Sequence, residues 1–135
     1  MNLFAYGTLL VPKIWEAVTG APQPRNEEAT LSRHRIFKVS GEDFPAIVET
    51  GRMEEVVPGR VFFDLPLAVI HSLDQYEDSF YERIEVEVST KSGSTIAQVY
   101  RIPRPKAGPV LSSETWTLEW FETEASDRYW ARLFG

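Results

Sequence analysis

Residues 82–102 carry the pattern that most constrains how this chain folds. Ile84, Val86 and Val88 alternate with charged residues, which is the two-residue period of a strand that buries one face. A Lys-Ser-Gly-Ser turn at residues 91–94 then leads into a second apolar segment, residues 95–102. We therefore predict an antiparallel hairpin in this part of the chain.

Four more segments show the features of strands. They are apolar, β-branched or aromatic and bounded by Gly and Pro, and they comprise residues 2–6, 29–39, 46–49 and 60–64. Two helices are predicted between them. Pro12 suits the first position of one, which Gly20 ends, and Pro66 opens the other.

The C-terminal third is rich in proline and then in aromatic residues. Residues 103–109 contain three prolines and are expected to form a loop. Beyond them we expect one or two helical turns that pack apolar side chains onto the sheet as core: Trp116, Trp120, Phe121, Tyr129, Trp130, Leu133 and Phe134.

Mostly antiparallel strands with a few short helices indicate the α+β class, as a small curled sheet or barrel capped by helices. The chain has 135 residues, no internal repeat and no linker-like segment. Residues 1–135 are therefore expected to form a single domain that folds on its own.

The composition excludes several classes of chemistry. The chain has no Cys, so thiol catalysis, iron–sulfur clusters and thiolate zinc sites are excluded, and its two His are not spaced as metal ligands. Its glycines form neither a G-x-G nor a phosphate-loop pattern. We expect neither a metal nor a cofactor.

Charge and hydropathy bear on partners and location. The chain has 14 Lys and Arg against 20 Asp and Glu, a net charge of −6 that argues against a nucleic-acid partner. The longest apolar stretch, residues 65–70, is far shorter than the roughly 20 residues of a membrane helix. Without Cys or a basic N-terminal region, the chain is expected to be cytoplasmic. The sequence does not determine the oligomeric state.

The first candidate for a functional site is the segment Tyr6-Gly7-Thr8-Leu9. A strand ends there at a glycine and the chain turns toward a helix, which leaves backbone N–H groups without strand or helix partners. Such amides can hold a carboxylate or an oxyanion, and Gly7 allows close approach because it has no Cβ. A glycine turn whose amides are satisfied by water is the other interpretation.

The second candidate is Glu77. It continues the helical stripe formed by Leu67, Ile70 and Leu73, so the stripe that faces the core ends in a carboxylate. Burial would raise the pKa of that carboxylate toward neutrality, as a general base requires. The alternative is that Glu77 lies just past the helix end and reaches solvent. Asp74 is the competing carboxylate.

The two histidines are weaker candidates. His34 lies between Arg33 and Arg35 and is expected on the surface of a strand. His71 lies on the second predicted helix, but the chain has no Ser in a G-x-S-x-G setting to complete a hydrolase triad.

Together, Phe-Ala-Tyr-Gly-Thr-Leu-Leu at residues 4–10 and Leu-Asp-Gln-Tyr-Glu at residues 73–77 resemble the gamma-glutamylcyclotransferase-like superfamily. The similarity is to its gamma-glutamylamine cyclotransferase and plant avirulence-induced branch. Supporting matches lie at residues 43–48, 57–62 and 81–88, so the resemblance spans residues 3 to about 102. The two motifs are specific as an ordered pair.

The resemblance implies a small, mostly antiparallel β-barrel with flanking helices. It also implies an enzyme, an acyltransferase or lyase without a cofactor, that converts a γ-glutamyl amide into 5-oxoproline and a free amine or amino acid. The family's catalytic acid falls on Glu77, and its substrate-binding loop falls on Tyr6, Gly7, Thr8 and Leu9. Tyr81 and Arg83 are lesser candidates.

One residue departs from the family pattern. The family usually has Gly after its catalytic Glu, whereas this chain has Asp78, whose charge raises the pKa of Glu77 further or reshapes the turn. A binding module that senses a small γ-glutamyl ligand without turnover is therefore an alternative. A third interpretation is a protein-interaction domain that uses exposed Trp116 and Trp120.

Overall fold

The computed structural model describes all residues, 1–135, and its central feature is the predicted hairpin. Strands β6 (Glu82–Thr90) and β7 (Gly93–Arg101) pair antiparallel from Glu82↔Arg101 to Thr90↔Gly93. Gly93 has a φ of +120°, which a residue with a side chain rarely adopts, so glycine at this position makes the tight turn possible.

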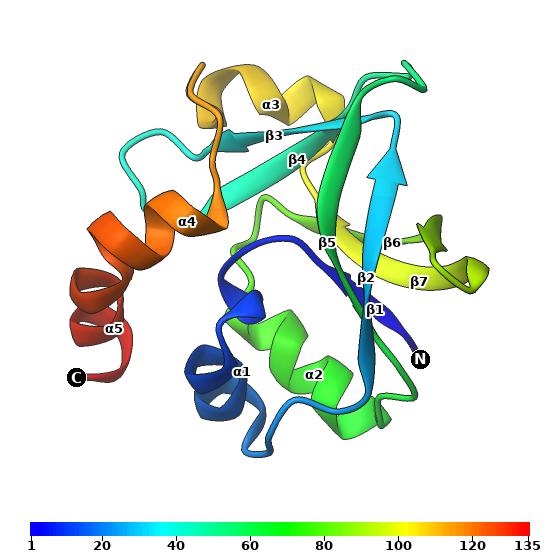
Figure 1. The fold of residues 1–135 in the computed structure, drawn as a ribbon. Helices are drawn as coiled ribbons and strands as arrows, with labels where there is room; N and C mark the ends of the chain where they lie inside the picture. The colour runs from blue at the N-terminus through cyan, green and yellow to red at the C-terminus, as the bar shows by residue number, and fades with distance from the viewer.

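Five strands close into a mixed barrel in the order β1-β5-β2-β6-β7 (Figure 1). Besides the hairpin they are β1 (Leu3–Ala5), β2 (Asn26–Ser32) and β5 (Val56–Phe62). All pairings are antiparallel except that of β1 with β7, which closes the barrel in parallel at Leu3↔Gln98. The expected α+β class with a mostly antiparallel barrel is confirmed.

The prediction of one strand over residues 29–39 was wrong, because the chain breaks at Arg33. Arg33 has a φ of +67°, a left-handed conformation that ends β2 and redirects the chain. The residues beyond it form β3 (His34–Lys38), which pairs with β4 (Pro45–Glu49) in a separate two-stranded sheet. Figure 1 shows this small sheet crossing above the barrel, next to α3 (Arg104–Val110).

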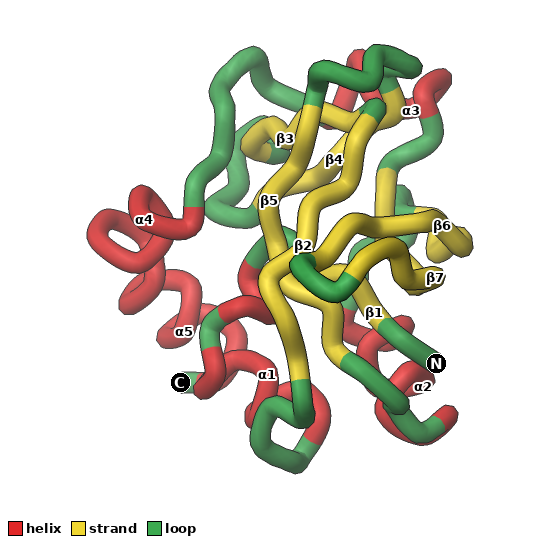
Figure 2. Tube along the Cα trace, turned by 45° about the vertical axis from the view of Figure 1, so that its right-hand side comes forward, coloured by secondary structure: helices red, strands yellow, loops and turns green.

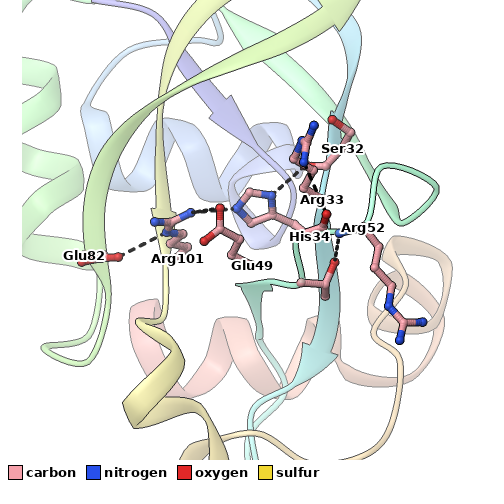
Figure 3. Close-up of polar contacts among 9 residues, drawn as sticks. Ser32, Arg33, His34, Glu49, Arg52, Glu82 and Arg101 are labelled. Atoms are coloured by element: carbon pink, nitrogen blue, oxygen red, sulfur yellow. Dashed lines mark hydrogen bonds and ion pairs between the residues drawn. The ribbon is translucent and has the colours of Figure 1, made fainter.

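The expectation that His34 lies on the surface was also wrong. Only 4% of the residue is exposed, and its Nδ1 donates to the carbonyl oxygen of Ser32 at 2.8 Å. Its Nε2 accepts from the guanidinium of Arg101 at 3.1 Å, and Arg101 also donates to Glu82 at 3.2 Å (Figure 3). These contacts tie the small sheet to the barrel, and burial lowers the pKa of His34.

Two helices cover one end of the barrel. Helix α1 (Pro12–Thr19) starts at the predicted proline and ends at Gly20, whose φ of +78° forms the C-cap. Its Trp15 is buried and stacks on Phe62 of β5 with ring centroids 4.5 Å apart. Helix α2 (Leu67–Tyr76) lies beside α1, as Figure 1 shows, and buries Ile70 and Leu73.

The C-terminal third is more helical than predicted. The expected proline loop is largely α3, because prolines at the start of a helix replace N–H groups that have no acceptor there. Further on, α4 (Leu118–Trp120), a π-helical turn (Phe121–Ala125) and α5 (Ser126–Phe134) form one arm that runs beside α1 (Figure 2). None of these helices has the length and apolarity needed to cross a membrane.

Most of the C-terminal aromatic residues pack as predicted. Trp116, Phe121 and Tyr129 are buried, and Trp120, Trp130 and Phe134 are partly buried against the same cluster. Trp116 is only 2% exposed and donates its indole N–H to the carbonyl oxygen of Asp43 at 2.8 Å. An interaction surface built on an exposed Trp116 is therefore contradicted.

Candidate active site

A pocket of about 610 Å³ lies where the end of β1, the end of α2 and α5 meet. Its lining includes Tyr6, Gly7, Thr8, Leu9 and Glu77, so the fold brings both candidate segments to one cavity. The volume suits a small metabolite. The strand end supplies one wall, the residues after α2 a second and the C-terminal helix a third.

The segment after β1 turns tightly at Gly7. The N–H groups of Leu10 and Val11 donate to the carbonyl oxygens of Gly7 and Thr8 at 3.0 and 3.1 Å, and the N–H of Gly7 donates to no backbone or side-chain acceptor. A Cβ on Gly7 would lie 2.9 Å from Cγ of Pro45. The two chain segments can therefore approach this closely only because residue 7 has no side chain.

Tyr6 forms a fixed part of the wall. It is 7% exposed, and its hydroxyl donates to the carbonyl oxygen of Tyr100 at 2.6 Å. Burial, reinforced by the negative charge of Glu77, holds the pKa of Tyr6 well above its ordinary value. The hydroxyl therefore stays protonated and shapes the cavity.

Three hydroxyl groups form a chain across the pocket. The hydroxyl groups of Thr8 and Tyr76 are 2.8 Å apart, and that of Tyr76 is hydrogen-bonded to that of Tyr129. Tyr129 comes from α5, and from the sequence it is expected only in the core. Phe121, Ala125 and Tyr129 recur every four residues, which indicates a buried helix face, but this spacing does not show that the face reaches the pocket.

Glu77 is the C-cap of α2, so the helix ends one residue before it. Its N–H donates to the carbonyl oxygen of Leu73 at 3.1 Å, and its backbone is extended. The side chain is not released into bulk solvent, since the residue is partly buried and lines the pocket. The backbone of Glu77 thus lies past the end of the helix, as the alternative interpretation had it. Its side chain is partly buried, so the expected burial of the carboxylate is correct in part.

The carboxyl group of Glu77 has no protein partner: no hydrogen bond or ion pair reaches it. Burial raises its pKa to about 8, and the negative charges of Asp78 and Asp74 add to this effect. At neutral pH the group is therefore poised between its acid and base forms. A carboxyl in this state can accept a proton and return it.

Asp74, the competing carboxylate, is in a different situation. Arg83 donates to it at 2.8 Å and the hydroxyl of Tyr100 donates to it at 2.6 Å. Burial acts to raise the pKa of Asp74, but these two hydrogen bonds outweigh it and the pKa is lowered. Asp74 does not line the pocket, so it is a structural ion-pair partner that stays charged.

Of the two lesser candidates, Tyr81 lies in the pocket and Arg83 does not. Tyr81 lines the pocket, and its hydroxyl donates to the carbonyl oxygen of Pro45, the residue that a Cβ on Gly7 would clash with. Arg83 lies outside the lining and is held by Asp74 and Gln98. No group of three or more His, Asp or Glu side chains is arranged to hold a metal ion.

Asp78, the residue that differs from the family pattern, lies at the rim of the pocket with Glu42 and Arg132. Burial and the charge of Glu42 raise the pKa of Asp78, while the positive charge of Arg132 acts in the opposite direction. Glu42 and Arg132 form an ion pair at 3.2 Å. Neither Glu42 nor Arg132 belongs to a sequence pattern that predicts a pocket residue.

Comparison with known proteins identifies relatives of this fold. A family model described as gamma-glutamyl cyclotransferase, AIG2-like, matches residues 3–118. AIG2-like protein D of Arabidopsis thaliana is 30% identical over 87 residues, which are 64% of this chain and 55% of that protein. The alignment therefore spans about half the length of this curated relative.

Solved structures agree on the architecture. A solution structure of an Arabidopsis thaliana protein matches with a TM-score of 0.72 at 24% identity, over 97% of this chain and 78% of that one. A structure named gamma-glutamyl cyclotransferase matches with a TM-score of 0.64 at 19% identity, over 75% of this chain and 65% of that one. At these identities the likeness concerns the fold.

The family model runs from β1 to the first residue of α4. It therefore includes the whole barrel, the Gly7 turn and Glu77, and leaves α5 outside. Because the match covers most of the sequence, the chain belongs to the gamma-glutamyl cyclotransferase, AIG2-like family.

Proposed function

We propose that this protein is a cyclotransferase that converts a γ-glutamyl amide into 5-oxoproline and a free amine or amino acid. The observation that carries the proposal is the partnerless carboxyl of Glu77, with a pKa near 8, in the same pocket as the Gly7 turn. A structural carboxylate of this protein, such as Asp74, has partners and a lowered pKa instead.

The reaction requires little more than positioning and proton transfer. The α-amine of the glutamyl unit attacks its own γ-carbonyl carbon, a five-membered ring closes, and the bond to the leaving nitrogen breaks. Holding the reacting groups of an intramolecular reaction in a near-attack geometry can supply up to roughly 7–11 kcal/mol. The substrate supplies its own nucleophile, so the protein needs none.

In this proposal Glu77 moves the protons. In its ionised form it takes a proton from the α-ammonium group, which frees the lone pair for attack, and it delivers that proton to the leaving nitrogen as its bond to the γ-carbonyl carbon breaks. The attacking nitrogen then loses its second proton, through Glu77, to the released amine, which leaves as an ammonium ion. General acid–base catalysis by a positioned side chain contributes about 10²–10⁴-fold. A pKa near 8 supports both steps, because neither protonation state is strongly disfavoured near neutral pH.

The Gly7 turn binds a negatively charged oxygen group of the glutamyl unit. The free N–H of Gly7 supports binding of the α-carboxylate or of the oxyanion that develops on the γ-carbonyl. Tyr6 walls the cavity, and the Thr8–Tyr76–Tyr129 hydroxyl chain offers polar contacts. The reaction draws on side chains and backbone amides only.

The test is release of 5-oxoproline from a panel of γ-glutamyl amino acids and γ-glutamyl amines by the purified protein and by its Glu77→Gln variant. Release by the wild type alone supports both the reaction and the base. Thermal stabilisation by a panel member without release of 5-oxoproline would instead favour a binding module that senses the ligand. Asp78, which stands where the family usually has Gly, is the reason to consider that alternative. Release at the wild-type rate by Glu77→Gln contradicts the mechanism.

A further inference from the structure

The ionisable lining of the pocket is acidic apart from one residue. Glu42, Glu77 and Asp78 contribute carboxyl groups, and Arg132 of α5 is the one cationic side chain. Arg132 lies beyond residue 118, so the family match does not extend to it. A ligand that carries a carboxylate at the rim has this guanidinium as its only positively charged side-chain partner.

Arg132 is held loosely. Its Nη2 lies 3.2 Å from Oε2 of Glu42, but none of its N–H groups makes a hydrogen bond within the protein. Its guanidinium lies 5.7 Å from the ring centroid of Tyr129, and 49% of its side chain is exposed. The donors of the planar guanidinium are therefore free to form a bidentate pair with a ligand carboxylate.

Arg128, one helical turn earlier, shows the opposite state. It donates two hydrogen bonds to the carboxylate of Asp43, at 2.8 and 2.6 Å, and it does not line the pocket. Arg128 thus fastens α5 to the segment that precedes β4. Since that anchor exists, attachment of the helix does not require Arg132.

Arg132 lines the same pocket as Glu77, and its charge acts on Asp78, the residue after Glu77. In the proposed function Glu77 delivers the proton to the leaving nitrogen. We therefore place the leaving group on the side of the pocket that Arg132 lines. Of the two groups that the Gly7 turn is proposed to bind, we place the α-carboxylate of the glutamyl unit there. A second carboxylate on the substrate is present when the leaving group is an amino acid and absent when it is a simple alkylamine.

We propose that Arg132 binds the carboxylate of the leaving amino acid, so that the pocket selects γ-glutamyl amino acids over γ-glutamyl alkylamines. This inference rests on the proposed function. When the ligand binds, Arg132 exchanges its ion pair with Glu42, which has no hydrogen bonds, for a bidentate hydrogen-bonded pair with the ligand carboxylate. Without the guanidinium, Glu42 and Asp78 would repel the same carboxylate, so Arg132 sets the sign of the preference.

The experiment compares γ-glutamylalanine with γ-glutamylethylamide, which differ only in the carboxylate on the leaving group. Affinities are measured by calorimetry in the Glu77→Gln background, where turnover does not interfere. We expect γ-glutamylalanine to bind about 10- to 100-fold more tightly, as charge-assisted hydrogen bonds allow. Arg132→Met should abolish or reverse this preference, because Glu42 and Asp78 then repel the ligand carboxylate. Arg132→Lys should retain part of the preference, and the control Arg128→Met should leave it unchanged.

The outcomes separate the two proposals. Equal or weaker binding of γ-glutamylalanine, or an equal loss for both ligands in Arg132→Met, overturns the role of Arg132. If the wild type releases 5-oxoproline but the binding ratio is near one, only this inference fails. If the ratio is large but no 5-oxoproline is released, only the cyclotransferase fails. Absence of binding by both ligands overturns both.

Discussion

Arg83 donates hydrogen bonds to both carboxylate oxygens of Asp74, at 2.8 and 3.3 Å. These bonds give Asp74 a different protonation behaviour from Glu77. The two carboxyl groups are three residues apart, yet the pKa of one is lowered and that of the other is raised to about 8. Asp74 stays ionised and adds to the field that keeps a proton on Glu77.

The first prediction concerns these two residues. Glu77→Gln should lower kcat for 5-oxoproline release by about 10²–10⁴-fold with little change in ligand affinity, because the amide cannot exchange protons. Asp74→Asn should lower kcat far less, since it removes an ion-pair partner outside the pocket. Steady-state kinetics with calorimetry on both variants checks this, and a larger loss in Asp74→Asn contradicts the assignment of the base.

The second prediction is a pH dependence. Because Glu77 must be ionised to accept a proton, kcat/KM should rise with pH and level off above about 8. Asp78→Asn removes the negative charge that, of the two, contributes more to raising this pKa, so the acidic limb should move to lower pH. A pH–rate profile for wild type and variant measures the shift; an unmoved limb means that another group controls the rate.

The third prediction tests the close approach at the Gly7 turn. Gly7→Ala places a Cβ 2.9 Å from Cγ of Pro45, which should destabilise the fold by about 1–3 kcal/mol and impair ligand binding. Gly108→Ala is the matched control, since its Cβ would meet nothing within 4 Å in α3. Denaturant unfolding distinguishes them, and equal stability of the two variants removes the steric argument.

The fourth prediction uses the His34 network of Figure 3. The pKa of His34 is lowered by burial, with Arg101 acting in the same direction and Glu49 and the Ser32 carbonyl opposing. The unfolded chain therefore binds the proton first, and the free energy of unfolding falls as the pH drops below about 6.5.

His34→Gln keeps the size of the side chain but cannot titrate. At pH 8 it should be less stable than the wild type by about 1–3 kcal/mol, because buried hydrogen bonds are lost. The gap should narrow toward acidic pH, since only the wild type loses stability through this group. Urea unfolding at several pH values measures the gap, and a constant difference would show that His34 does not titrate in this window.

The sequence predicted the hairpin well because its alternation and its turn are local signals. The break between β2 and β3 was missed for a physical reason: a single residue separates two strand-like segments, and the left-handed conformation at Arg33 depends on where the flanking strands pair. The burial of His34 follows from that break. Neighbouring residues in the chain gave no sign of either.

The two candidate segments were found because a glycine after a strand and a carboxylate ending an apolar stripe are visible in one sequence. Their meeting in one pocket and the partners of Asp74 depend on tertiary pairing. Tyr129 and Arg132 were missed as pocket residues, since helical spacing predicts a buried face but not the surface that it meets. The roles assigned to Glu77 and the Gly7 turn remain predictions.

The pocket is held together by contacts between residues far apart in the sequence. Tyr6 and Tyr100 are 94 residues apart, and Tyr76 and Tyr129 are 53 apart. Contacts of such separation form late and slowly in folding, and they are lost together when the barrel opens. Ligand binding is therefore expected to report on the folded state of the whole chain, and an intermediate that has only the β6–β7 hairpin should bind nothing.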